Sequence, residues 1–437
     1  MNLDTAYVRA YLADVTTRIT LAANALDWAH GKQELLNTDL IPPFPTESTA
    51  YAEAYKDWQR YQKQVQSLGP RALKTKRMGA VGDINWGGRD AGGIDDKLAQ
   101  LNLRALARTA FDPLCVNGIT AGMAFLDEET RENRIQILGG FLEPFYREDD
   151  PTSDPIGLYQ VTQDPGNFRV RYRVRVYDFG ERSIREWRDL DDPTKLDGPP
   201  SEEWTKTSVP RVATFDTDQD GYPVGELAQC LTTLAGEVAD QLRILRVADT
   251  QAWGILALAG DWDADTEMGA TTILRSTEAS STASRIEPAS LEPLFQKHDR
   301  TMERLRGDLS LPIASIGGGQ WPSGEALHQA NIAYISSSSD YATILSEFLT
   351  ALTRDFALLE GVPEEKSPPV TISISREQMR NVVSKQARED YQAGIVSLRM
   401  AVTSVAPYYP NATDDDIELF LGVTPAPDIT DDEEGGE

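Results

Sequence analysis

The spacing of apolar residues predicts helices along much of the chain. Apolar side chains recur every three or four residues, the period of a helix that buries one face. Helical patterns cover residues 4–30, 51–67, 94–108, 225–253, 291–309 and 324–360. The last is the longest, and only the serines at 336–339 interrupt its apolar pattern before Gly361 and Pro363 end it. The sequence therefore predicts a mainly helical protein.

One stretch has the alternation of a half-buried strand. Between Phe168 and Val176, apolar residues alternate with arginines at 169, 171, 173 and 175, so one face should be packed and the other should carry a row of arginines. Residues 178–180 should turn the chain into a return strand over 183–187, and 370–374 alternates as a further strand. Pairing of the arginines with nearby carboxylates is favoured over contact with phosphate. Strands among the helices place the protein in the α+β class.

Size and charge narrow the class of protein. A chain of 437 residues exceeds what one hydrophobic core usually supports, so two or three structural units are expected. The net charge of −27 disfavours a protein that grips nucleic acid, because phosphate binding depends on lysine and arginine; an alternative is that the charge only maintains solubility. The basic cluster at 71–77 is expected on a solvated surface.

The sequence also gives expectations about the compartment. Two cysteines without metal or disulfide spacing fit a reducing environment. The start, MNLDTAYVRAYLAD, lacks the apolar region of a signal peptide. The longest apolar run, 252–259, is far shorter than the ~20 residues that span a bilayer. We therefore expect a protein that is cytoplasmic where it is made and that has no membrane partner.

A glycine-rich stretch, SIGGGQWPSGEALHQA, occupies residues 315–330. Glycines leading into a helix are a common phosphate site, and Gly319 and Gly324 have the spacing of a P-loop. However, Glu325 stands where the P-loop needs lysine and Ala326 where it needs serine or threonine. The charge is reversed and the Mg²⁺ ligand is missing, so neither a nucleotide nor another cofactor is expected here.

An acidic loop, DTDQDGYPVGE, is the one metal-like signal. Asp216, Asp218, Asp220 and Gly221 match the first positions of an EF-hand loop, but the twelfth position is Leu227 instead of glutamate. A turn before a helix is the commoner meaning of such a loop, so the aspartates remain weak metal candidates. The three histidines are far apart in the sequence and no nucleophile has a partner base, so we expect no catalytic residue and no enzyme.

Five segments, in their order along the chain, resemble the portal proteins of tailed bacteriophages, the head-to-tail connectors. These segments are ALDWAHGKQEL (25–35), RVRVYDFGERSIREW (173–187), SVPRVATFDTDQDGYPVGELAQCLTTLAGEVADQL (208–242), LSLPIASIGGGQWPSGEALHQA (309–330) and QAREDYQAGIVSLRMAV (386–402). They are similar to the family's segment after the first helix, its hairpin, its strand and descending stem helix, its loop before the long wing helix, and the start of its crown. Each segment is weak alone, and their order is the specific feature.

The resemblance implies a portal-like division of the chain. Its parts are an N-terminal wing (1–223), stem helix 1 (224–257), clip (258–290), stem helix 2 (291–310), tunnel loop (311–323), the wing's long helix and strand (324–375), crown (376–424) and an acidic tail (425–437) that composition predicts to be disordered. The loop beside DNA would comprise Ser315, Ile316, Gly317, Gly318, Gly319, Gln320 and Trp321. The wing helix would start at Ser323, Gly324 and Glu325. This chain departs from the family in a short polar clip and in a loop without the charge that some relatives place near DNA.

The resemblance also implies a function and partners. Family members form rings, typically of about twelve subunits, at one capsid vertex of the virion. They conduct double-stranded DNA during packaging and ejection and bind the terminase motor, the major capsid protein and head–tail adaptor proteins. The alternative is another virion structural protein, such as an adaptor or minor head protein. A calcium-dependent enzyme is the third hypothesis.

Overall fold

The structure is a computed structural model of the chain. It describes residues 8, 22, 25–26, 28–29, 31, 65, 67–86, 94–127, 129–146, 154–164, 171–193, 195–196, 198–204, 209–217, 221–252, 255–259, 282–286, 290–311, 324–374, 387–388, 391–392, 397–405 and 417. In this part of the chain most strands follow one another between two groups of helices, and all their pairings are antiparallel, as is typical of the α+β class.

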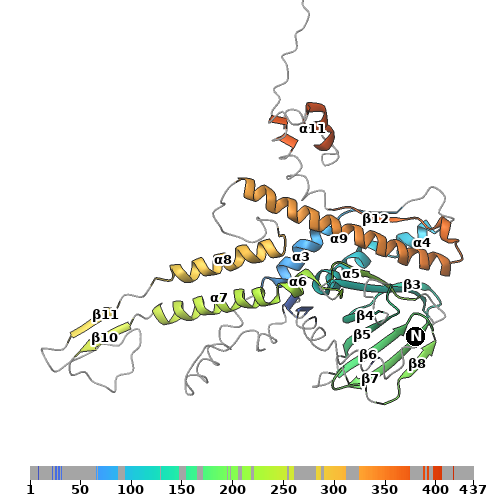
Figure 1. The fold of residues 1–437 in the computed structure, drawn as a ribbon, viewed down its shortest axis with the longest axis horizontal. Helices are drawn as coiled ribbons and strands as arrows, with labels where there is room; N and C mark the ends of the chain where they lie inside the picture. The colour runs from blue at the N-terminus through green and yellow to red at the C-terminus, as the bar shows by residue number, and fades with distance from the viewer. Residues whose placement is uncertain are drawn as a thin grey trace, which may run out of the picture.

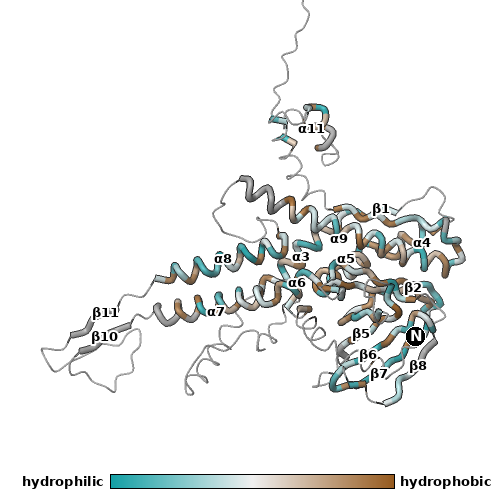
Figure 2. Tube along the Cα trace, in the orientation of Figure 1, coloured by the Kyte–Doolittle hydropathy of each residue, from teal (hydrophilic) through white to brown (hydrophobic). Residues whose placement is uncertain are grey.

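A helical arm extends from one side of a body that contains the sheets (Figure 1). Helix α7 (Leu231–Ala252) leads outward, β10 (Ile255–Ala259) and β11 (Thr282–Ile286) form an antiparallel hairpin, and α8 (Glu292–Asp308) returns. At 1.5 Å per residue, the 22 residues of α7 span about 33 Å. Figure 2 shows α8 as largely hydrophilic, whereas hydrophobic residues gather where helices and strands of the body meet.

The five-stranded sheet of the body is an antiparallel meander. Its order is β4-β5-β6-β7-β8, so each strand pairs with its sequence neighbours. The strands are β4 (Phe141–Phe145), β5 (Gly157–Asp164), β6 (Arg171–Asp178), β7 (Ser183–Leu190) and β8 (Ser201–Trp204). The predicted hairpin is confirmed: Asp178 Oδ1 accepts hydrogen bonds from the backbone N–H groups of Gly180 and Glu181, each 3.0 Å long, which fixes the turn between β6 and β7.

The two faces of this sheet differ as alternation predicts. One face packs Tyr159, Val174, Val176 and Trp187 into a core that Val8 also joins. The opposite face carries the arginines of β6. Because successive side chains of a strand point to opposite faces, this division follows directly from the sequence pattern.

Two smaller sheets connect the meander to the helices. One has the order β3-β2-β9 and the other pairs β1 with β12. Their strands are β1 (Ile84–Trp86), β2 (Ile119–Leu126), β3 (Asn133–Ile137), β9 (Arg211–Thr214) and β12 (Val370–Ile372). Helix α9 (Gly324–Leu359) holds one edge of β12, because Ser346 Oγ and Thr350 Oγ1 accept from the backbone N–H groups of Ile372 and Val370 at 2.8 and 2.9 Å.

The main core lies where several helices meet below α9. These helices are α3 (Gly69–Ala80), α5 (Leu103–Asn117), the start of α7 and α9 (Gly324–Leu359). The long helix predicted over 324–360 is therefore confirmed. The serines at 336–339 do not interrupt it, and Ser337 and Ser338 are buried. No described helix is long and apolar enough to span a membrane.

The helix predicted over 94–108 is wrong in its extent. The structure has α4 (Asp95–Gln100), a break, and then α5, which continues through Pro113. Asn102 causes the break: it has a left-handed φ of 44°, and its side chain accepts from the backbone N–H of Ala105 at 3.2 Å, starting the new helix. Local hydrogen bonding of one asparagine thus overrides the apolar pattern.

Two chain segments cross closely where the arm leaves the body. Gly225 precedes the short helix α6 (Glu226–Gln229), and a Cβ at this position would lie 2.2 Å from the Val116 carbonyl oxygen. Gly118 ends α5 with φ of 76° and would similarly meet the backbone of Val224. Only glycine permits this approach, which anchors the base of the arm to α5.

The remaining described elements are small. A short 3-10 helix, η3 (Glu364–Lys366), follows α9, and α11 (Leu398–Val405) lies apart from the sheets in Figure 1. Helix α11 forms its own apolar cluster with Ala387 and Ile417. Both cysteines are buried and free, as the sequence predicts, and burial is the main cause that raises the pKa of each thiol to about 12.

Candidate functional site

The two helices of the arm are joined by a buried carboxylate. Asp240 on α7 is 5% exposed and accepts hydrogen bonds from Lys297 Nζ at 2.6 Å and Thr301 Oγ1 at 3.3 Å, both on α8. Arg243, one turn further along α7, donates to the same carboxylate at 3.0 Å. Hydrogen bonds to an ionised acceptor are stronger than neutral ones. Asp240 therefore fixes the register of the antiparallel pair.

A second carboxylic acid, Glu237, is fully buried one turn before Asp240. The Gln241 amide donates to its Oε1, whereas Oε2 has no hydrogen-bond partner assigned among the described residues. Burial is the main cause that raises the pKa of Glu237 from 4.5 to about 7; Asp240 adds to the rise, and the contacts with Gln241 and the Leu68 backbone oppose it. The base of the arm thus contains an acid that changes charge near neutral pH.

A polar cluster lies where the arm, α3 and α9 meet; we call it the junction cluster and define it by Lys76, Glu226, Ser337 and Tyr341. Lys76 is 2% exposed, forms an ion pair with Glu226 and donates to Ser337 Oγ at 2.9 Å. Ser337 and Tyr341 donate to the two oxygens of Glu226 at 3.2 and 3.0 Å. Because Glu226 opens α6, the cluster ties the start of the arm to α3 and α9.

Aromatic rings shield the junction cluster. The ring of Tyr341 stacks on Phe215 with centroids 4.0 Å apart and meets Phe111 edge-on at 5.1 Å. Lys76 Nζ lies 5.6 Å from the centroid of the Tyr341 ring. Burial, followed by the neighbouring Cys115 and Glu226, raises the pKa of the Tyr341 hydroxyl well above its usual value. The tyrosine therefore stays protonated and remains a hydrogen-bond donor to Glu226.

The sequence did not predict the junction cluster. The basic cluster was expected on a solvated surface, and this is wrong for Lys76, which is buried. The half-buried Arg77 donates from Nη1 to both carboxylate oxygens of Asp112, at 2.9 and 3.1 Å. A signal was present: Lys76 lies at helical spacing from the buried Ala72, Leu73 and Ala80. A lysine on the apolar face of a helix indicates a buried partner.

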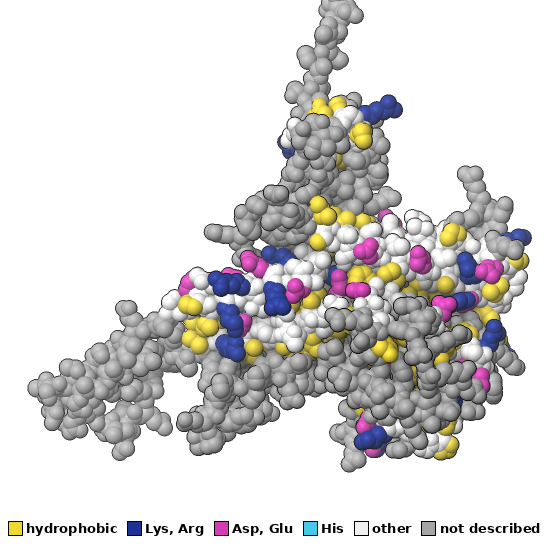
Figure 3. Space-filling model, viewed as in Figure 1, with side chains coloured by type: hydrophobic (Ala, Val, Ile, Leu, Met, Phe, Trp, Pro, Cys, Tyr) yellow, Lys and Arg dark blue, Asp and Glu magenta, His cyan; other side chains and the backbone are white. Residues whose placement is uncertain are grey.

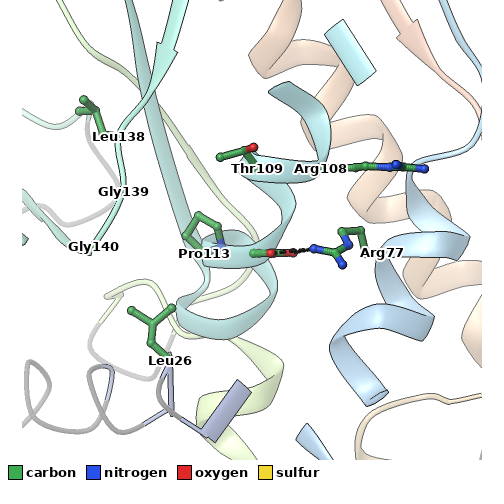
Figure 4. Close-up of a pocket in the computed structure, with 9 residues that line it drawn as sticks. Leu26, Arg77, Arg108, Thr109, Pro113, Leu138, Gly139 and Gly140 are labelled. Atoms are coloured by element: carbon green, nitrogen blue, oxygen red, sulfur yellow. Dashed lines mark hydrogen bonds and ion pairs between the residues drawn. The ribbon is translucent and has the colours of Figure 1, made fainter. Parts of the chain in front are cut away.

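A surface pocket of about 280 Å³ adjoins this part of α3 and α5 (Figure 4). Leu138, Gly139 and Gly140 line one side, and Arg77 and Arg108 come from the helices. Among the described residues that line it, Asp112 is the one carboxylate, and it is held by Arg77, so these residues offer no free acid–base pair.

The predicted tunnel loop lies outside the described residues. None of Ser315 to Trp321, nor Ser323, is described, whereas Gly324 and Glu325 form the first turn of α9. On the other side, Leu309 and Leu311 follow the end of α8 and have buried side chains. The structure therefore describes the chain only on either side of the predicted loop, and the bounds of the loop and the assignment of its residues to DNA remain predictions.

The acidic loop is described only in part. The backbone of Thr217 bridges to Pro223, and Val224 N–H donates to the Asp216 carbonyl at 3.0 Å, which closes a turn before α6. The Asp216 side chain accepts from the N–H of Thr217, and Asp218 and Asp220 lie outside the described residues. Within the described part of the chain, no group of three acidic, histidine or cysteine side chains is arranged to hold a metal ion.

Comparisons with known proteins give only distant structural likeness. No family model and no curated protein matches the chain. Three solved chains are similar at 13% identity. One, from the neck of an empty gene transfer agent particle computed with C6 symmetry, has a TM-score of 0.43 and covers 88% of this chain and 96% of its own. The virion of the native particle gives 0.42, and its neck computed with C12 symmetry 0.40; each covers 82% of this chain and 90% of its own. Values of this size assign neither a family nor a function.

Proposed function

We propose that this chain is a portal-type protein, a ring-forming conduit for double-stranded DNA at one vertex of a virus-like capsid. It would assemble in the host cytoplasm, bind a terminase motor, the major capsid protein and head–tail adaptors, and act without catalysis or a cofactor. The wing, stem, clip and crown would have the boundaries stated above. The sequence resemblance supports this proposal through the order of its five segments.

The order of the helices and strands in the arm also supports the proposal. An outgoing helix, a strand pair at the far end and a returning helix are followed, after 15 intervening residues (309–323), by a helix of 36 residues. This order is what the stem, clip, stem, tunnel loop and wing helix of the proposed architecture require. Two carboxylates hold this arrangement together. Asp240 joins α7 to α8, and Glu226 joins the base of the arm to α3.

The charge of the chain suits such a conduit. A passage for a moving polyanion should not bind it tightly, since each phosphate contact adds affinity and slows movement. A ring of chains that each carry −27 repels DNA. Figure 3 shows acidic and basic side chains intermixed along the visible face of the arm, without a continuous basic track.

Ring formation is the first prediction. We expect purified protein, alone or in particles, to form closed rings of about twelve subunits around a central channel. Negative-stain imaging and mass photometry measure symmetry and mass directly. A protein that stays monomeric under all assembly conditions and is absent from rings in particles would contradict the proposal. A ring of different symmetry without a channel would favour the adaptor or minor head protein.

The second prediction concerns the glycines of the proposed tunnel loop. Deleting Gly317 to Gly319 should leave ring assembly intact and reduce DNA packaging or retention, because glycine lets a loop adopt several backbone conformations beside DNA. Nuclease-protected DNA per particle measures the effect. A matched control is deletion of Gly435 and Gly436 near the acidic C-terminal end. Unchanged packaging in the loop deletion would refute the assignment of this loop.

Calcium binding tests the third hypothesis, a calcium-dependent enzyme. Titration calorimetry with calcium should give no heat if the acidic loop at Asp216 is only a turn. Saturable heat that disappears in an Asp216→Asn variant would favour a metal site instead.

A further inference from the structure

One face of the five-stranded sheet concentrates arginine side chains on an otherwise acidic protein. We call it the arginine face and define it by Arg171, Arg173, Arg175 and Arg188. The first three are alternate residues of β6, so they point to the same side, and Arg188 comes from the neighbouring β7. The three side chains of β6 are 31–32% exposed and that of Arg188 is 65% exposed. All four are therefore accessible to a ligand.

A single carboxylate holds most of this face together. Glu186, opposite Arg175 in the register, accepts from Arg175 Nε at 2.6 Å and also from Arg188, while Arg173 Nε lies 3.9 Å away. Burial opposes ionisation of Glu186, but the hydrogen bonds from Arg175 and Arg188 outweigh it and lower its pKa. The glutamate thus stays charged and keeps the guanidinium groups close together. The prediction that these arginines pair with carboxylates is confirmed for those described.

The pairing leaves the face rich in hydrogen-bond donors. The described part of this face has four guanidinium groups but only two carboxylates that pair with them, Glu186 and Asp191. Asp191 binds Arg171 at 2.5 Å. Four guanidinium groups have roughly twenty N–H donors, whereas two carboxylates offer roughly eight acceptor sites. Arg173 has additional interactions, so the donors available to a ligand come mainly from Arg171, Arg175 and Arg188. The surplus donors and positive charge match anionic oxygens.

We propose that the arginine face binds a carboxylate-rich, extended segment of a partner protein. Alternate residues along β6 are about 6.6–6.8 Å apart, and alternate side chains of an extended segment have the same spacing. Arg171 and Arg175 are two such steps apart, so acidic residues four positions apart in the segment could each meet one of them. Planar guanidinium groups bind carboxylates through two parallel hydrogen bonds, which favours this pairing.

Carboxylates of a protein fit this face better than phosphates of duplex DNA. The arginine face is short: in the sequence, Asp189 directly follows Arg188, and Asp192 directly follows Asp191. Duplex DNA is stiff and needs contacts to many phosphates for affinity. It would bring further phosphates against these acids, whereas a flexible segment can follow the row alone. The proposal does not depend on ring formation.

Binding of a synthetic acidic peptide tests the proposal. The probe is a fluorescein-labelled twelve-residue peptide that alternates glutamate with serine, compared with its glutamine counterpart. Fluorescence anisotropy with the full chain at low salt should show saturable binding of the glutamate peptide alone, weakening as salt is added. The Arg171→Gln, Arg188→Gln double variant should bind roughly fivefold more weakly or worse.

Two further variants separate binding from stability. Arg354→Gln removes an exposed arginine that pairs with Glu364 on another surface, and it should leave binding unchanged. Glu186→Gln removes the competing carboxylate and should strengthen binding severalfold even if it lowers the melting temperature. A purely structural role predicts lower stability and no gain in binding.

Three results would overturn the proposal. These are equal binding of the glutamate and glutamine peptides, unchanged binding in the double arginine variant, and preferential binding of a twelve-base-pair DNA duplex that the double variant abolishes. The last result would instead assign the face to nucleic acid. Ring formation, imaged on the same samples, does not depend on any of these three results. Failure of the peptide test would therefore not contradict the portal proposal.

Discussion

Replacing Lys76 with methionine should lower the free energy of unfolding by about 3 kcal/mol, because breaking a buried ion pair leaves an uncompensated charge. Methionine keeps the length of the side chain and fits the apolar surroundings, so little packing is lost. The substitution leaves the charge of Glu226 unpaired: its side chain is 15% exposed and, among the described residues, would keep Ser337 and Tyr341 as donors. Chemical denaturation of the purified chain measures the loss.

The reason for this effect can be isolated with a double-mutant cycle. Glu226→Gln in the Lys76→Met background removes the stranded charge and should recover most of the stability. Arg354→Met is the control, since Arg354 and Glu364 form an exposed pair and its loss should cost less than 1 kcal/mol. Equal losses in Lys76→Met and Arg354→Met, or no recovery in the double variant, would mean that the junction cluster does not hold the base of the arm.

The expected consequence extends beyond stability. The junction cluster connects the start of the arm with α3 and α9, and the segment at 312–323 lies between α8 and α9. If that segment moves while DNA passes, α9 is the element that receives the movement. A weakened junction should then reduce DNA retention even in rings that assemble normally, which nuclease protection of packaged DNA would measure.

Regular patterns made much of the fold predictable from the sequence. Alternation identified β6, and the apolar period identified α8 and α9 to within about a residue at each end, because these elements bury one continuous face. The single helix predicted over 225–253 is divided at Cys230 into α6 and α7. The break at Asn102 was missed, since it depends on one side chain that bonds to the backbone instead of on periodicity. Strands such as β10 were also missed: its five apolar residues are consistent with either a strand or the end of a helix.

The candidate site was less predictable, for a physical reason. The junction cluster joins residues that are 150 and 261 positions apart, and no local pattern encodes such contacts. The serines at 336–339 looked like an interruption of a helix, yet Ser337 is the residue that bridges Lys76 and Glu226. A polar residue on an apolar helix face indicates that a partner exists without identifying it.

A second large effect is expected from Glu237→Gln, which should stabilise the protein above neutral pH. The pKa of Glu237 is about 7 in the folded chain against an ordinary value of 4.5, so the folded state binds this proton more tightly than the unfolded state. Stability therefore falls as pH rises between these two values. A pKa increase of this size corresponds to about 3 kcal/mol once pH exceeds 7.

Glutamine has nearly the shape of the protonated acid and cannot ionise, so it removes this cost. At pH 8 the variant should be more stable than the original chain by up to about 3 kcal/mol, and at pH 4 the two should be nearly equal. Asp240, the charged neighbour that adds to the rise, remains paired with Lys297 and Arg243 in both proteins. Glu303→Gln, at an exposed position of α8, is the matched control and should show no such pH dependence. Because Glu237 lies beside the contacts that join α7 to α8, a gain confined to high pH would identify its ionisation as a force that loosens the base of the arm. A gain of equal size at pH 4 and pH 8 would instead assign the effect to packing.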